Sequence, residues 1–216
     1  MMLLQTLQRI HDQHKAVVLT SSLSNEDQLL THYYCQVTKT PDIVVLDTGR
    51  LHPQTYDLMA ETEKYYQFRY RVIMPDSNAV ESLVATHGIN LFYDNVANRK
   101  ACCYVRKVQP LERALATADA WITGLRREHS PERSQIQEVD KHGTIMKYSP
   151  LVAWTESDLI EHMRLHKIPE NALYRSGYRS IGCAPCTRAI GADAPVRSGR
   201  WWWEETEKKE CGLHTT

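Results

Sequence analysis

The sequence lacks features that would direct the protein to nucleic acid, a membrane or the secretory route. Lys+Arg and Asp+Glu balance at 26 residues each, so no general basic field favours nucleic acid, and any anion site requires a local cluster. No apolar run approaches the length of a membrane span. The opening residues, MMLLQTLQRIHDQHK, lack a signal peptide's order of charge, long apolar run and small cleavage-site residues, and they are typical of a short amphipathic helix. The expected compartment is therefore the cytoplasm.

Internal repeats, low-complexity tracts and two common phosphate-binding motifs are also missing. There is neither the GxxxxGK[ST] of a Walker A loop nor the GxGxxG of a dinucleotide fold. The stretch SSLSNED, from Ser21, follows a predicted strand and opens a predicted helix, where backbone N–H groups can meet an anion. On this stretch alone, an ordinary helix N-cap at Ser24 is the better interpretation.

Strands and helices alternate along most of the 216 residues. Short apolar, β-branched runs predict strands, and 3.6-residue periodicity with capping residues predicts helices. Such alternation indicates an α/β fold: a parallel sheet with helices on both faces, of one medium domain or one domain with an appendage. The predicted strands span residues 16–22, 42–49, 68–75 and 120–127, with an extended piece at 144–151, and the predicted helices span residues 24–37, 53–66, 77–88, 111–118 and 155–168.

Ligands of open parallel sheets bind outside the carboxyl ends of the strands. Here those ends carry SSLSNED, LDTGR and TGLRR, which makes the three stretches candidates for a binding site. The regular pattern fades after about Gly182. We therefore expect an α/β domain over residues 1–194 and a C-terminal segment over 195–216.

Six cysteines would suit three disulfides in a secreted chain, but the expected reducing compartment argues against them. Cys35 lies in a helical pattern and is expected to be a small core residue. The other thiols include two pairs, Cys102–Cys103 and the CxxC of Cys183–Cys186. Four soft thiolates suit zinc or an iron–sulfur cluster. Adjacent cysteines fit one zinc ion poorly, because their side chains diverge on a helix, whereas a four-iron cluster offers ligand positions spread over a cube.

The flanks of the cysteine pairs favour a shared site over two unrelated motifs. RKACCYVRK is basic, and IGCAPCTR is a tight Gly/Pro turn. Four thiolates on a doubly charged four-iron cluster carry a net charge of about −2. The cations Lys100, Arg106 and Lys107 would offset that charge or connect it to a bound anion.

Further arginines and three consecutive tryptophans follow. Arginine suits bidentate contact with phosphate or sulfate, although each arginine taken singly is more often a solvated surface charge. The tryptophans of RSGRWWWEE cannot all lie on one face of a regular element, so some belong to the core and one is a candidate lid or interface residue. The arginines are Arg126, Arg127, Arg133, Arg188, Arg197 and Arg200.

Cys211 lies in the terminal stretch KKECGLHTT. Structural cysteines are usually buried, whereas chain termini are usually poorly tied down. A thiol in such a stretch is a candidate nucleophile that moves onto a substrate bound elsewhere.

Six blocks together resemble the phosphoadenylyl/adenylylsulfate reductase family: SSLSNEDQLL, LDTGRLHPQTYDL, CCYVRKVQPLERAL, WITGLRREHSPERSQ, IGCAPCTRAI and GRWWWEETEKKECGLH. The resemblance runs from about Val17 to His214, and the combined CC, CxxC and ECGLH blocks indicate its iron–sulfur branch, the assimilatory adenylylsulfate reductases. It implies an adenine-nucleotide α-hydrolase-like (PP-loop type) fold and a [4Fe–4S] cluster on Cys102, Cys103, Cys183 and Cys186. It also implies thioredoxin, or a glutaredoxin-like protein, as reductant and Cys211 as the nucleophile.

The same resemblance implies how the substrate is bound. The phosphosulfate group falls to Lys107, Arg133, Arg197 and Arg200, with Arg126 and Arg127 as weaker candidates. The loop on the phosphate side corresponds to Ser22, Leu23, Glu26 and Asp27, and the adenine and ribose side to Leu46, Asp47, Thr48 and Gly49. The family often has glycine where this chain has Ser24, a departure that bears on the detailed contacts of the loop.

Three alternatives stay open at this stage. The substrate could be 3′-phosphoadenylyl sulfate, or both nucleotides. A PP-loop ATP pyrophosphatase shares the fold, but SSLSNED is not the SGGxDS-like loop of that class. A non-catalytic metal-binding module would not need ECGLH. The sequence leaves open whether the protein forms a homo-oligomer.

Overall fold

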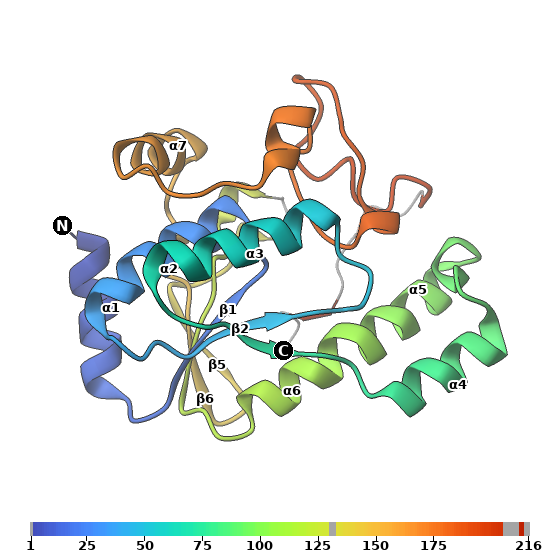
Figure 1. Ribbon diagram of the computed structural model, residues 1–216, viewed down its shortest axis with the longest axis horizontal. Helices are drawn as coiled ribbons and strands as arrows, with labels where there is room; N and C mark the ends of the chain where they lie inside the picture. Colours follow the sequence, from blue (N-terminus) through green and yellow to red (C-terminus); the bar gives the residue numbers. More distant parts are fainter. Residues whose placement is uncertain (1, 130–132, 205–211, 214–216) are drawn as a thin grey trace.

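The computed structural model describes residues 2–129, 133–204 and 212–213. Within those ranges, six strands form one sheet in the order β3-β2-β1-β4-β6-β5 (Figure 1). All neighbouring strands are parallel except β5 and β6, which form an antiparallel pair. The strands are β1 (Val17–Ser21), β2 (Ile43–Leu46), β3 (Arg71–Ile73), β4 (Ala120–Ile122), β5 (Val139–His142) and β6 (Ile145–Tyr148).

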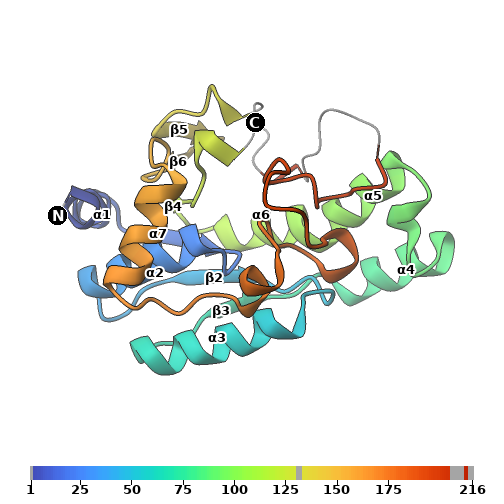
Figure 2. The ribbon, with the colours of Figure 1, turned by 90° about the horizontal axis from the view of Figure 1, so that it is seen from above.

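Helices cover both faces of the sheet, as Figures 1 and 2 show. The predicted α/β architecture is therefore confirmed. The helices are α1 (Met2–Gln13), α2 (Asn25–Val37), α3 (Pro53–Tyr66), α4 (Ser77–His87), α5 (Val96–Cys103), α6 (Gln109–Leu115) and α7 (Glu156–Leu165). None of the described helices is both long and apolar enough to cross a membrane.

The two faces of the sheet belong to two separate apolar clusters, because alternate residues of a strand point to opposite sides. Leu19, Ile43 and Ile122 pack with α1, α2 and α7, whereas Val18 and Val44 pack with α6 on the other face. Cys35 is partly buried against the first cluster, which agrees with its expected place in the core.

Capping residues begin two helices where the sequence predicts. The Ser24 side chain accepts a hydrogen bond from the Asp27 N–H and starts α2, and Thr155 forms a complete capping box with Asp158 at the start of α7. The antiparallel strand β5 was not predicted. Its residues are mostly exposed and polar, so it lacks the apolar pattern of a buried strand, and it reaches the sheet edge through a turn in which Gly143 has a φ of 61°.

A helix through the first cysteine pair was not predicted either. Asn95 caps α5 by accepting a hydrogen bond from the Asn98 N–H, and α5 continues into a π-helical turn over Tyr104–Val108. In both views the segment after α7, which carries the second cysteine pair, lies alongside α5 (Figure 2). Two sequence-distant cysteine pairs are therefore close in space.

Candidate active site

A cavity of about 190 Å³ lies at the carboxyl ends of β1, β2 and β4, where the parallel sheet predicts a ligand site. Ten of the predicted binding residues line it. They are Ser22, Leu23, Glu26, Asp27, Leu46, Thr48, Lys107, Arg133, Arg197 and Arg200.

The loop between β1 and α2 is held in a tight curve by one buried carboxylate. Asp27 Oδ2 accepts hydrogen bonds from Ser22 N at 2.6 Å and Ser22 Oγ at 2.7 Å. Leu23, which follows Ser22 in this loop, has a φ of 60°, a left-handed backbone conformation that residues with a Cβ rarely adopt. Burial raises the pKa of Asp27 to about 6, although the hydrogen bonds from Ser22 lower it. The strained loop thus depends on Asp27.

Gly124 makes room for this carboxylate. A Cβ added at Gly124 would lie 2.3 Å from Asp27 Oδ1. We expect Gly124→Ala to lower the free energy of unfolding by about 1–3 kcal/mol, the usual cost of inserting an atom into a packed site. Urea denaturation would measure the change. Gly191→Ala is the matched control, because its Cβ meets nothing within 4 Å, and an equal effect of both variants would contradict this role of Gly124.

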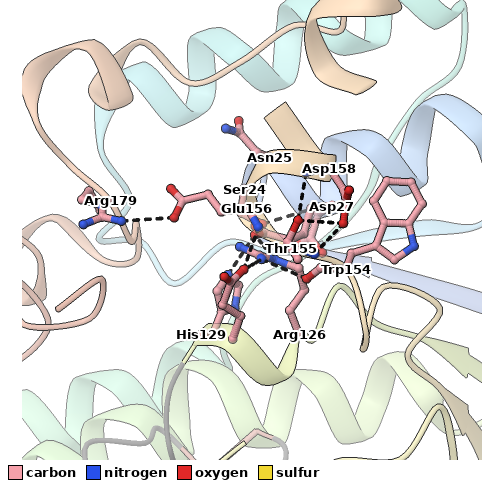
Figure 3. A network of polar contacts seen from close by, with 12 residues as sticks. Ser24, Asn25, Asp27, Arg126, His129, Trp154, Thr155, Glu156, Asp158 and Arg179 are labelled. Carbon is pink, nitrogen blue, oxygen red and sulfur yellow. Dashed lines mark hydrogen bonds and ion pairs between the residues drawn. The ribbon is translucent and has the colours of Figure 1, made fainter. Parts of the chain in front are cut away.

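Glu26 organises a second group of charges beside the loop, and Figure 3 shows two of its partners, Arg126 and His129. Its Oε1 accepts hydrogen bonds from Arg126 Nε at 2.9 Å and from His129 Nε2 at 2.8 Å. Burial alone raises the pKa of Glu26, but the hydrogen bond and charge of His129, together with Arg126, lower it to about 2. His129 also lines the cavity, and its Nδ1 is 3.3 Å from Arg133 Nη1. The series of contacts from Glu26 through His129 to Arg133 therefore connects a buried anion with a cation of the cavity wall.

Four predicted binding residues do not line the cavity. Arg126 is buried against Glu26, and Arg127 is exposed and donates to the Ile136 carbonyl. Asp47 is committed to its own turn, because Oδ1 accepts from Gly49 N and from Tyr56 Oη, each at 2.8 Å. Gly49 allows that turn with a φ of 68°. In the described structure these four residues therefore form contacts or turns outside the cavity wall.

Other cavity residues were not singled out from the sequence. Arg179 joins the cavity wall to α7: it donates to Glu156 Oε2 at 3.1 Å and to the carbonyls of Ala192 and Ala194 (Figure 3). Leu213 packs against the apolar cluster under α6 and also lines the cavity. Arg179 is a lone arginine without a recognisable spacing, and Leu213 belongs to the ECGLH block, in which the prediction concerned only Cys211.

The four paired cysteines line a second, smaller cavity. Cys102 and Cys103 end α5, whereas Cys183 precedes and Cys186 ends a short 3-10 turn over Ala184–Cys186. None of the four forms a disulfide with another described residue. Among the described residues, no three His, Cys, Asp or Glu side chains are grouped closely enough to hold a metal ion.

The cysteine cavity is strongly cationic. Arg50, Arg99, Arg106, Lys107 and Arg200 line it. Burial raises the pKa of Cys186 to about 11, with a further contribution from Cys183. At Cys183 burial also acts to raise the pKa, but Lys107, the Thr48 hydroxyl and nearby arginines lower it below its usual value. The surroundings thus favour at least one thiolate.

Three residues connect the two cavities. Lys107 and Arg200 line both. Thr48 lines the larger cavity, and its Oγ1 is 3.2 Å from Cys183 Sγ. Arg200 lies close to Gly182, where an added Cβ would be 2.7 Å from the guanidinium carbon. An anion in the larger cavity would therefore share its cations with the cysteines.

Trp201 is separated in its contacts from Trp202 and Trp203, whose rings pack against each other and against Tyr93. Trp201 is buried, lines the cysteine cavity and contacts both Arg99 and Arg200, whose guanidinium carbons lie 4.5 and 4.7 Å from its ring centroid. Trp202 contacts Arg188, and Trp203 Nε1 donates to the Phe92 carbonyl. The expectation that some of them belong to the core is confirmed by Trp201.

The predicted nucleophile, Cys211, lies outside the described residues. The nearest described residues are Glu204 on one side and Gly212 and Leu213 on the other.

Parallel strands with a cavity at their carboxyl ends, beside the N-terminus of α2, make up an α/β fold of the adenine-nucleotide α-hydrolase-like type. Solved structures share this fold. The chain superposes on a phosphoadenylyl-sulfate reductase from Candida auris with a TM-score of 0.72 and 23% identity, covering 87% of this chain and 90% of that one. It matches an FMN adenylyltransferase from Candida glabrata with a TM-score of 0.59 and 13% identity, covering 99% and 76%.

Sequence comparison identifies the family. Residues 16–189 match the model of the phosphoadenosine phosphosulfate reductase domain. The adenosine 5′-phosphosulfate reductase of Burkholderia cepacia is 45% identical over 97% of this chain and 85% of its own length. That of Allochromatium vinosum is 42% identical over 98% and 83%. The chain belongs to the phosphoadenosine phosphosulfate reductase family.

Proposed function

We propose that the protein is an adenylylsulfate (adenosine 5′-phosphosulfate) reductase of sulfate assimilation, which forms sulfite and AMP with a thioredoxin-type reductant. The observation that carries the proposal is the pair of cations, Lys107 and Arg200, shared by the larger cavity and the cysteine cavity. The names of the curated relatives support the same reaction.

The larger cavity suits a nucleotide with two adjacent anionic groups. Its apolar walls, which include Leu46 and Leu111, suit a purine, and its cations suit phosphate and sulfate. Lys107, Arg133, Arg197 and Arg200 are the proposed ligands of the phosphosulfate. The N-terminus of α2 lies at the same place, and its partial positive charge favours an anion there.

The cysteine cavity suits a [4Fe–4S] cluster held by Cys102, Cys103, Cys183 and Cys186. A zinc ion would require four ligands about 2.3 Å from one centre, whereas a four-iron cluster takes each thiolate on a separate iron. Two buried donors, Arg200 Nε and Trp201 Nε1, have no hydrogen-bond partner in the described structure. Both residues line this cavity, and such donors suit sulfur acceptors. When bound, the cluster supplies negative charge that orients the surrounding cations.

Cys211 is the proposed nucleophile. Leu213 lines the nucleotide cavity, and it is only two residues from position 211. Two residues span at most about 7 Å, so a chain anchored at Leu213 can offer a thiolate to the same cavity. The thiolate attacks the sulfate sulfur, the S–O bond to phosphate breaks, and AMP leaves with that electron pair. Cys211 then carries an S-sulfo group.

The reductant regenerates the enzyme by thiol exchange. One thiolate of a dithiol protein attacks Cys211 Sγ, and sulfite leaves with the electrons of the sulfur–sulfur bond. The second thiol resolves the mixed disulfide. Cys211 is restored, and the dithiol has lost two electrons to become a disulfide.

Comparing turnover of two nucleotides tests the proposal. Adenylylsulfate should yield sulfite with reduced thioredoxin, and 3′-phosphoadenylyl sulfate should be turned over with a much lower kcat/KM. Sulfite and AMP would be quantified together. No sulfite from adenylylsulfate would refute the proposed activity, and a higher kcat/KM for the 3′-phosphorylated nucleotide would assign the other substrate.

The shared cation gives a more specific prediction. Arg200→Ala should weaken binding of adenylylsulfate by about 1.5–3 kcal/mol, the usual contribution of a hydrogen bond to a charged group. Calorimetry in a Cys211→Ser background would measure affinity without turnover. Arg188→Ala is the matched control, since Arg188 also contacts a tryptophan but lines neither cavity. Equal affinity in both variants would place Arg200 outside the binding site.

A further inference from the structure

Arg99 and Glu204 form an ion pair that neither the proposed binding site nor the proposed thiol chemistry uses. Arg99 Nε donates to Glu204 Oε1 at 2.8 Å, and Arg99 Nη2 donates to Oε2 at 2.9 Å. The two side chains are 0% and 3% exposed. This bidentate geometry fixes the direction of both side chains as well as their separation.

Arg99 belongs to the cysteine-bearing helix. It precedes Cys103 by four residues, so the two side chains lie on one face of α5. Burial acts to lower the pKa of Arg99, but the hydrogen bond and charge of Glu204, with smaller contributions from Cys103, raise it above its usual value. Arg99 therefore stays charged and contacts both an acid and a proposed cluster ligand.

Glu204 belongs to the other side of the site. The turn before it is tied down, because Trp201 N donates to the Cys186 carbonyl and Glu204 N donates to the Trp201 carbonyl. Trp201 has a φ of 43°, an uncommon conformation for a tryptophan, and its ring contacts Arg99. The ion pair holds this strained turn against α5.

Glu204 is close in sequence to the proposed nucleophile, which connects the ion pair with the proposed reaction. Glu204 precedes Cys211 by seven residues, and Leu213 follows Cys211 by two. Leu213 packs at the nucleotide cavity, and Glu204 is held beside the cysteine cavity. The chain on each side of the proposed nucleophile is thus attached to one of the two cavities.

A buried ion pair is a costly way to stabilise a fold, because both charges lose their hydration, and an apolar pair of similar volume often serves equally well. Unlike an apolar pair, however, a bidentate ion pair also fixes the relative orientation of its two side chains. We infer that Arg99 is a positioning residue for sulfur transfer: by holding Glu204, it fixes the start of the segment that carries Cys211 relative to the cysteine cavity. The inference rests on the proposed function.

Single-turnover labelling of Cys211 tests this role. Wild-type protein and the variants Arg99→Lys and Glu204→Gln would be mixed with adenylylsulfate without reductant, and the SO₃ adduct on the Cys211 peptide would be followed by mass spectrometry. Iron per chain and AMP affinity would be measured on the same samples. We expect both variants to retain iron and to bind AMP within twofold of wild type, but to form the adduct at least tenfold more slowly.

Two further variants separate positioning from stability. Asp42→Asn is a control for the loss of a bidentate pair: it disrupts the more exposed pair with Arg71, which lines neither cavity, and it should leave the adduct rate unchanged. The double variant Arg99→Met/Glu204→Leu replaces the pair by apolar side chains. It should regain any lost thermal stability and still form the adduct slowly.

The outcomes distinguish this inference from the proposed function. Adduct formation at the wild-type rate in the stable double variant would overturn the positioning role, and so would a loss of iron that accounts for the whole loss of rate. If the wild-type protein itself formed no adduct on Cys211, the proposed nucleophile would be wrong, whatever the variants did.

Discussion

Cys211→Ser should make no sulfite, yet remain brown, fold normally and bind adenylylsulfate. The expected loss of turnover is the largest that we predict, because no other thiol is placed to replace Cys211. Cys35 lies in α2 against the core, where burial raises the pKa of its thiol to about 11, and the four remaining thiols line the cysteine cavity. A serine hydroxyl is a far weaker nucleophile than a thiolate near neutral pH.

Trapping the intermediate gives the direct measurement. Wild-type enzyme mixed with substrate and no reductant should gain one SO₃ group on the Cys211 peptide, and reduced thioredoxin should remove it. Cys35→Ser is the control and should behave as wild type. An adduct on a different cysteine, or continued turnover by Cys211→Ser, would refute the mechanism even though the family assignment would stand.

The sequence predicts the elements of the sheet because local signals and burial agree there. Val17–Ser21 and Ile43–Leu46 are apolar runs of strand length, and Ser24 and Thr155 carry capping side chains that the structure uses. The edge strand Val139–His142 lacks such a signal. Its place in the sheet comes from a hairpin with the next strand, β6, through the turn at Gly143, and its own residues carry no strand pattern.

The candidate site also has features that the sequence predicts and features that it does not. Cysteine spacing predicts a shared site for Cys102, Cys103, Cys183 and Cys186, and the structure brings all four to one cavity. Arginine identity predicts less, because a guanidinium serves an ion pair as readily as a ligand: Arg126 is committed to Glu26, whereas Arg200 lines both cavities. The partner of a charged residue depends on the packing of distant segments, and no local pattern encodes it.

The cysteine cavity supports the second large prediction. Cys183→Ser should remove most of the iron, bleach the protein and nearly abolish turnover of adenylylsulfate. Cys183 is buried, contacts the Thr48 hydroxyl, and lies among Lys107 and Arg200, which hold the pKa of its thiol below the usual value. A serine in this place offers a hard oxygen that binds iron–sulfur clusters poorly. Without the anionic cluster, the surrounding cations would repel one another.

Iron analysis and visible absorbance would measure cluster content, and circular dichroism would show whether the fold persists. Cys35→Ser again serves as control, because it changes a cysteine outside the cavity. Repulsion among the uncompensated cations should also disturb the nucleotide cavity, since Lys107 and Arg200 belong to both. Affinity for AMP should therefore fall together with the iron content in Cys183→Ser. Full iron content and activity in this variant would exclude Cys183 as a ligand, and lost iron with unchanged AMP affinity would show that the two cavities are independent.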